Sequence, residues 1–390
     1  MNSYLSHLEC SDCSSTFSAD EIHGVCLRCG KSVLVRYHLE KVRNALPKSS
    51  LSTRTHSMWR YRELLPVIED QNIITLGEGF TPILRLRKIG DGLGLENLYL
   101  KDESQIPTGS FKARGLSVAI SKAKELGITK IVLPTAGNAG SAAAAYAARA
   151  GVEVHVFAPM GTPEVNKKEI VAYGAELHLV DGLISDAGRM VSELKEANHW
   201  FDVSTLKEPY RVEGKKTMGF ELAEQFGWPL PDAIVFPTGG GTGVIGMWKA
   251  FAELEALGWI SDKRPKMFVV QSSGCAPLVK AFEEQKDEST FWQNAHTVAA
   301  GLCVPKAFAD QLILKAIRES GGVAVAVTDA EIMESVREVA QKEGILVCPE
   351  GGAAVAALKH LKERELVSGK ETVVVFNTGS ALKYMHLFGM

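Results

Sequence analysis

From Leu98 onwards, short β-branched runs alternate with helical segments. In GLSVAISKAKELG, apolar residues recur at helical spacing from Leu116 to Ala123, and Gly127 closes the predicted helix. The run KIVLP that follows is typical of a buried strand. This alternation predicts an α/β protein with two parallel-sheet lobes and a cleft at the carboxyl ends of the strands, where open α/β sheets bind ligands. A helical linker over 37–75 precedes it.

The N-terminal segment contains two C-x-x-C pairs separated by twelve residues. This spacing predicts a zinc-ribbon-like segment over residues 1–36, in which four thiolates hold one tetrahedral zinc ion. The alternative is a ribbon that has lost its metal and packs on the rest of the protein. The four candidate ligands are Cys10, Cys13, Cys26 and Cys29.

Composition excludes several classes of function. The 390 residues carry 43 basic and 46 acidic side chains, a formal net charge of -3, which does not favour binding to nucleic acid or to an anionic membrane. The chain has no apolar run long enough to span a bilayer, and its first residues lack the features of a signal peptide. We therefore expect a cytoplasmic protein.

A glycine-rich loop follows the predicted strand AIVFP and precedes a predicted helix. Such a loop lets backbone N–H groups turn towards an anion at a helix N-terminus, so it is a candidate phosphate cradle. The alternative is a simple tight turn. The loop comprises Gly239, Gly240, Gly241, Thr242 and Gly243.

Two polar residues lie at predicted helix starts. Lys112, in GSFKARG, lies where the positive end of the helix dipole helps to hold an amine neutral and nucleophilic. The alternative is a solvated surface lysine. Asn138 lies in the turn AGNAG before an alanine-rich helix, where asparagine also occurs because it tolerates left-handed backbone geometry.

Together with NTGS at residues 377–380, these motifs resemble the fold-type II pyridoxal-phosphate (PLP) enzymes, the tryptophan synthase beta-like family. The resemblance covers about residues 75 to 385. It implies that Lys112 forms a Schiff base with the cofactor and that Asn138 faces the cofactor's 3-oxygen. It also implies that Gly239 to Gly243 hold the cofactor phosphate and that the Thr378 hydroxyl meets the pyridine nitrogen.

Within this fold type, the turn GEGFTP and the segment PYRVEGKKT are similar to those of the threonine synthase family. This resemblance implies that Arg211 binds a substrate phosphate, and a guanidinium suits that role. Ser204 and Thr205 stand where members of the family commonly have asparagine and serine, so they replace them in part. Ser110 and Thr135 are the expected hosts of the substrate carboxylate.

The expected reaction converts O-phospho-L-homoserine and water into L-threonine and phosphate. The alternatives are serine or threonine dehydration, β-replacement on an activated serine, or a non-catalytic scaffold. The resemblance further implies a homodimer that acts on a small-molecule amino acid. The expected domains are a large PLP-binding domain over 37–114 and 205–390 and a small α/β domain over 115–204.

Overall fold

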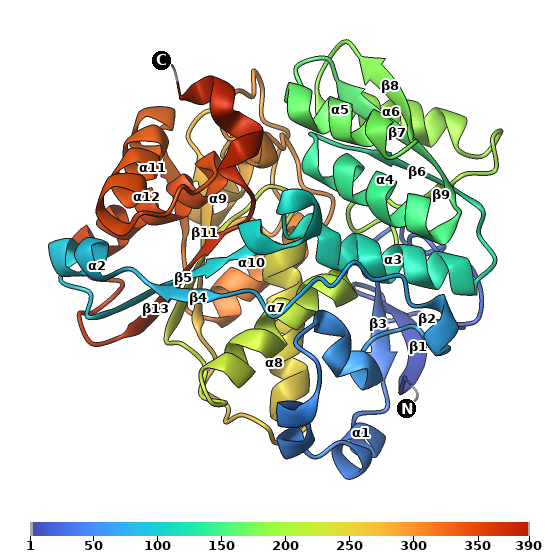
Figure 1. Ribbon diagram of the computed structural model, residues 1–390, viewed down its shortest axis with the longest axis horizontal. Helices are drawn as coiled ribbons and strands as arrows, with labels where there is room; N and C mark the ends of the chain where they lie inside the picture. Colours follow the sequence, from blue (N-terminus) through green and yellow to red (C-terminus); the bar gives the residue numbers. More distant parts are fainter. Residues whose placement is uncertain (1–2, 389–390) are drawn as a thin grey trace. The chain divides into compact units, whose positions relative to one another are not determined.

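The computed structural model describes residues 3–388 and contains three β-sheets (Figure 1). The first sheet is antiparallel, with strand order β2-β1-β3. Its strands are β1 (Leu5–Cys10), β2 (Thr16–Phe17) and β3 (Val33–Tyr37). The linker that follows contains α1 (Leu39–Ala45) and short 3-10 turns, in agreement with the predicted helical segment.

The second sheet is parallel throughout, with strand order β8-β7-β6-β9. Its strands are β6 (Lys130–Pro134), β7 (Glu153–Pro159), β8 (Glu176–Val180) and β9 (Phe201–Asp202). Helix α6 (Ile184–Leu194) packs on the face that carries Val132 and Phe157. The opposite face carries Val156, against which Gly140 of α4 (Asn138–Ala150) lies. Helices α3 (Lys112–Glu125) and α5 (Glu164–Ala172) pack against α4.

The third sheet has strand order β12-β11-β10-β13-β5-β4, and β4 alone among these strands is antiparallel to its neighbour. Its strands are β4 (Ile83–Arg85), β5 (Asn97–Asp102), β10 (Ala233–Pro237), β11 (Lys266–Ser272), β12 (Ala324–Val327) and β13 (Thr372–Asn377). The accompanying helices are α2 (Arg87–Leu93), α9 (Pro277–Glu283), α10 (Asp310–Glu319), α11 (Asp329–Glu343) and α12 (Pro349–Glu363).

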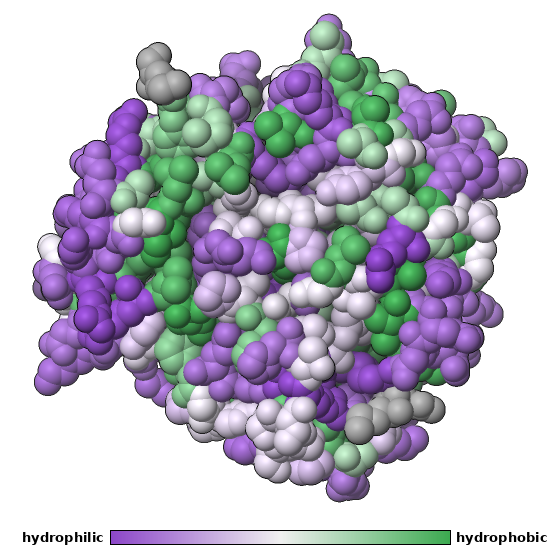
Figure 2. Space-filling view, viewed as in Figure 1, coloured by the Kyte–Doolittle hydropathy of each residue, from purple (hydrophilic) through white to green (hydrophobic). Residues whose placement is uncertain are grey.

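Helix α11 shows why these segments fold as they do. A capping box between Thr328 and Glu331 begins the helix, and Gly344 ends it in the left-handed conformation. Its inner side buries Ile332, Val336 and Val339. The margin of Figure 2 where α11 and α2 lie, at the left of the view, is mostly hydrophilic. The predicted α/β class with mostly parallel sheets is therefore confirmed.

The chain divides into two compact units. Among the described residues, the first comprises 3–80, 112–221 and 246–260, and the second comprises 81–111, 222–245 and 261–388. The two remaining α-helices of the described residues are α7 (Arg211–Gln225) and α8 (Thr242–Ala256). The domain boundaries and the cleft inferred from the sequence remain predictions. No helix within residues 3–388 is long and apolar enough to cross a membrane.

Candidate active site

The predicted glycine-rich loop connects the end of β10 to the first turn of α8. A Cβ atom at Gly239 would collide with the Gly301 carbonyl, and one at Gly243 would collide with the Phe236 ring. Gly241 has a φ of 82° and no room for a Cβ beside Ile313. Three positions of the loop therefore require glycine. The close packing holds its backbone at a helix N-terminus, which is suited to binding an anion.

Thr378 and Ser110 lie in the same unit as the glycine loop. β13 and β10 are adjacent parallel strands, so their carboxyl ends lie side by side. Thr378, directly after β13, therefore lies at the same end of the sheet as the loop after β10. The Thr378 carbonyl accepts a 3.1 Å hydrogen bond from the Phe111 N–H, and Ser110 pairs with Gly379 in a short antiparallel bridge. The Ser110 hydroxyl is buried and has no hydrogen-bond partner among the described residues.

Lys112 follows Phe111 and is the first residue of α3, as predicted. It is half-buried, and its carbonyl accepts a 3.0 Å hydrogen bond from Lys215 Nζ. Two residues further on, fully buried Arg114 makes a bidentate ion pair with Glu221 of α7, with N···O distances of 2.5 and 2.8 Å. These contacts fix the first turn of α3, and with it the backbone that carries the Lys112 side chain.

Thr135 and Asn138 lie between β6 and α4. The Thr135 hydroxyl oxygen accepts hydrogen bonds from the N–H groups of Gly137 and Gly140, at 2.9 and 3.0 Å, and so caps α4. Asn138 Oδ1 accepts a 3.1 Å hydrogen bond from Asn166 Nδ2. Because its oxygen is engaged, the Asn138 side chain keeps its NH₂ group for another acceptor. The sequence gives no signal for Asn166, a buried residue in the first turn of α5.

Arg211 is the first residue of α7 and is almost fully buried. Its Nη1 donates to the Val203 carbonyl at 2.7 Å, whereas Nε has no partner among the residues described. Burial lowers the pKa of Arg211, and the charges of Glu208 and Asp202 oppose this shift. The structure thus holds a buried cation with one unused donor.

The surroundings of Arg211 differ in part from the prediction. Ser204 is buried, and its hydroxyl donates to Asp202 Oδ1, so this hydroxyl hydrogen is already engaged. Thr205, the next residue, is half-buried. Glu208 accepts hydrogen bonds from the N–H groups of Tyr210 and Arg211, and burial raises its pKa to about 7 although the charge of Arg211 opposes the shift.

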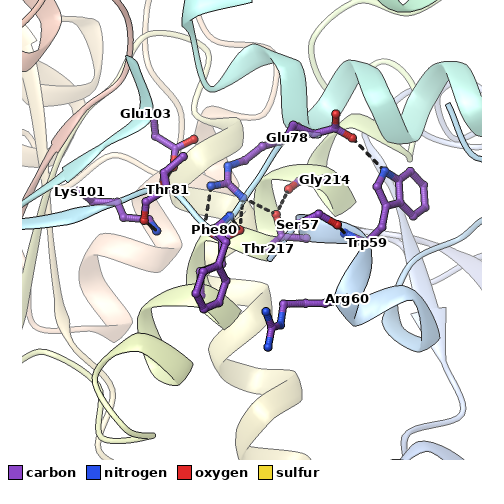
Figure 3. Close-up of polar contacts among 12 residues, drawn as sticks. Ser57, Trp59, Arg60, Glu78, Phe80, Thr81, Lys101, Glu103, Gly214 and Thr217 are labelled. Atoms are coloured by element: carbon purple, nitrogen blue, oxygen red, sulfur yellow. Dashed lines mark hydrogen bonds and ion pairs between the residues drawn. The ribbon is translucent and has the colours of Figure 1, made fainter. Parts of the chain in front are cut away.

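Glu78, in the GEGFTP turn, has a positioning role that the sequence did not indicate. Its buried carboxylate accepts hydrogen bonds from Trp59 Nε1 at 2.9 Å, Ser117 of α3 at 2.6 Å and Tyr146 of α4 at 2.6 Å. Figure 3 shows Trp59 and Glu78 pointing towards one another. Glu78 therefore fastens α3, which starts at Lys112, to α4, which starts at Asn138.

The four N-terminal cysteines converge beside the first sheet, with Cys10 at the end of β1 and the other three outside its strands. Their sulfur atoms all lie within 4.8 Å of one another, with Cys10–Cys29 at 3.4 Å and Cys13–Cys26 at 3.6 Å. With a Zn–S bond of about 2.3 Å, a tetrahedral site has S···S separations of about 3.8 Å. The arrangement is compatible with a tetrahedral metal site.

Comparisons with known proteins identify relatives of this chain. The family model described as pyridoxal-phosphate dependent enzyme matches residues 74–379. The threonine synthase of Methanocaldococcus jannaschii is 36% identical over 96% of this chain and 92% of its own length. The threonine synthase of Methanosarcina acetivorans is 36% identical over 97% and 92%, and that of Synechocystis is 35% identical over 86% and 85%.

Solved structures give the same fold. Maize serine racemase superposes with a TM-score of 0.69 at 21% identity and covers 86% of this chain and 99% of its own. A threonine deaminase from Solanum lycopersicum has a TM-score of 0.67 at 19% identity, covering 85% and 92%. The fold is therefore that of fold-type II PLP enzymes. The chain belongs to the family of pyridoxal-phosphate dependent enzymes, as a relative of the threonine synthases.

Proposed function

We propose that this enzyme is a threonine synthase, which converts O-phospho-L-homoserine and water into L-threonine and phosphate. The observation that carries this proposal is the identity of 36% to a threonine synthase along nearly the full length of both chains. The described residues suit the cofactor, since three positions of the glycine loop have no room for a side chain and Asn138 keeps an amide donor for another acceptor.

The chain's own groups have distinct tasks in this proposal. Lys112 binds the cofactor and later moves protons at substrate Cα and Cβ. The glycine loop Gly239–Gly243 holds the cofactor phosphate, Asn138 donates to its 3-oxygen, and the Thr378 hydroxyl meets its ring nitrogen. When bound, pyridoxal phosphate supplies an electron sink for the negative charge that develops at Cα.

The remaining groups bind the substrate. The unpaired Ser110 hydroxyl and the Thr135 hydroxyl hydrogen bind its carboxylate. The unused Nε of Arg211 binds its phosphate, because a guanidinium suits phosphate oxygens. Thr205 assists Arg211. The Ser204 hydroxyl donates its hydrogen to Asp202, so it does not donate to the substrate phosphate.

We further propose that Cys10, Cys13, Cys26 and Cys29 hold a structural zinc ion. A cytoplasmic homodimer, with no nucleic-acid or membrane partner, remains a prediction from the sequence.

The test is to incubate the PLP-loaded protein with O-phospho-L-homoserine and to measure free phosphate and threonine. We expect equimolar products, and we expect Lys112→Ala to lower the rate by at least about 10²–10⁴-fold while the protein stays folded. Absence of phosphate, together with formation of 2-oxobutyrate from threonine, would reject the proposal in favour of a dehydratase.

A further inference from the structure

Three metal-ligating side chains converge on one face of the four-stranded parallel sheet, away from the four cysteines in sequence and fold. His155 lies on β7, and Glu176 and His178 lie on the edge strand β8. Glu176 is the register partner of His155, and His178 is two residues beyond Glu176. Because residues two apart on a strand share a face, the three side chains project together.

Two separations, from His155 Nδ1 to His178 and from His155 Nδ1 to Glu176, match the edges of a coordination tetrahedron. His155 Nδ1 lies 3.4 Å from His178 Nε2 and 3.2 Å from Glu176 Oε2, while the other oxygen of that carboxylate, Oε1, lies 3.4 Å from His178 Nε2. One ligand atom from each of the three residues can be chosen so that all three lie within 4.8 Å of one another. Zinc bonds to nitrogen and oxygen of about 2.0–2.1 Å give tetrahedral edges of about 3.3 Å. Direct hydrogen bonds to nitrogen are usually shorter, with a mode of about 2.9–3.0 Å.

A second carboxylate sets the tautomer of His155. Its other ring nitrogen, Nε2, lies 2.8 Å from Glu153 Oε1, so an Nε2–H bond to Glu153 leaves the Nδ1 lone pair facing Glu176 and His178. In metal sites, a histidine ligand usually donates its second ring N–H to a carboxylate or carbonyl, which fixes the orientation of the ring.

Aromatic packing fixes both imidazole rings. The His155 ring lies 4.1 Å from Trp200, and the His178 ring stacks on Phe157 at 4.4 Å. The His155 side chain is 8% exposed, that of His178 30% and that of Glu176 62%. One side of the group is thus rigid and dry, while the other is open to an entering ion and a water ligand.

We propose that His155, Glu176 and His178 form a second metal site, which takes a zinc-class divalent transition ion with water in the fourth position and clamps β8 to β7. The donor set of two imidazoles and one carboxylate suits zinc and excludes magnesium or calcium as the preferred ion. This inference does not depend on the proposed function.

The test uses the full-length, PLP-loaded protein equilibrated at micromolar free zinc, with bound zinc counted per chain by mass spectrometry. Three variants are compared with the parent, namely His178→Gln, Glu176→Gln and His199→Asn. His199 is an exposed histidine outside the group and serves as the matched control. We expect the first two variants to bind one zinc ion fewer per chain than the parent and the control. Zinc at the four cysteines is common to all four proteins, so the difference isolates the proposed site.

A fourth variant tests the support of His155. Glu153→Gln keeps all three ligands, and we expect it to weaken zinc binding by about 10- to 100-fold in a competition titration with a chelating dye. Equal zinc content in all proteins would overturn the proposal, as would equal zinc affinity of the parent and His178→Gln.

Discussion

At the residue scale, the candidate site depends on a side chain that lies outside all the sequence motifs described above. Asn166 donates one hydrogen bond to Asn138 Oδ1 and another to Ser141, at 3.1 and 2.9 Å. Asn166→Asp has the same shape but cannot donate, so the Asn138 amide turns its NH₂ towards the new carboxylate. The donor proposed for the cofactor's 3-oxygen is then lost.

We expect Asn166→Asp to raise the dissociation constant for pyridoxal phosphate by about tenfold, the value of one hydrogen bond of roughly 1.4 kcal/mol. Fluorescence titration of the apoprotein with cofactor measures this change. Asn198→Asp, at an exposed position, is the control. An unchanged dissociation constant for Asn166→Asp would show that Asn138 does not depend on its neighbour.

A second residue-scale prediction concerns pH. The pKa of Glu208 is raised to about 7 by burial, against an ordinary value of 4.5 in the unfolded chain. Between these values the folded state binds more protons than the unfolded state, so this group's contribution to stability is complete at low pH and is lost as pH rises to 7. Glu208→Gln cannot titrate and lacks this dependence.

Urea unfolding of the parent and of Glu208→Gln at pH 5 and pH 8 measures the difference. We expect the free energy of unfolding of the parent, relative to the variant, to fall by about 2–3 kcal/mol between the two pH values. The exposed Glu193→Gln serves as the control. A relative stability that rises with pH would contradict the raised pKa.

At the element scale, the register of α3 against α4 depends on Glu78. One of its carboxylate oxygens accepts from Trp59 and Ser117, and the other accepts from Tyr146 and the Leu76 N–H. In Glu78→Gln, either orientation of the amide turns its NH₂ group towards two of these donors. If the NH₂ group faces Trp59 and Ser117, these donors still have the Ser117 hydroxyl and the Ile74 carbonyl as acceptors. The cost is then the loss of hydrogen bonds to a charged carboxylate, about 1–3 kcal/mol in total.

We therefore expect Glu78→Gln to lower the free energy of unfolding by about 1–3 kcal/mol, measured in urea against the exposed Glu40→Gln. The variant should also bind pyridoxal phosphate more weakly, since the helices that start at Lys112 and Asn138 lose a common anchor. Parent-like stability of Glu78→Gln would show that the three side-chain donors find other acceptors.

At the scale of the whole molecule, the sequence predicts the type of the elements better than their arrangement. The alternation after Leu98 correctly predicts parallel sheets, because its strands and helices follow local periodicity. It does not predict that β13 lies between β10 and β5, a pairing of segments more than 100 residues apart. It also gives no sign that Lys216 and Lys249 are buried beside Glu213, because the pairing of buried charges is a property of the folded chain.

The N-terminal sheet is joined to the segment that precedes and begins α7. Ser32 donates to the Leu206 carbonyl at 2.8 Å, and the Tyr37 hydroxyl donates to Glu213 at 2.8 Å. Both contacts flank Arg211. If zinc holds this sheet together, its loss loosens the residues proposed to bind the substrate phosphate, while the groups proposed to bind the cofactor keep their own anchors.

We therefore expect the double variant Cys10→Ser/Cys26→Ser to bind one zinc ion fewer per chain and to unfold at a lower temperature. Its KM for O-phospho-L-homoserine should rise, whereas its absorbance spectrum with pyridoxal phosphate should match that of the parent. Cys303→Ser, which changes a half-buried thiol outside the ribbon, is the control and should leave zinc content and KM unchanged. A double variant with unchanged zinc would reject the ribbon site. Loss of zinc with an unchanged KM would instead show that the contacts of Arg211 with Glu208 and Val203 are enough to hold it.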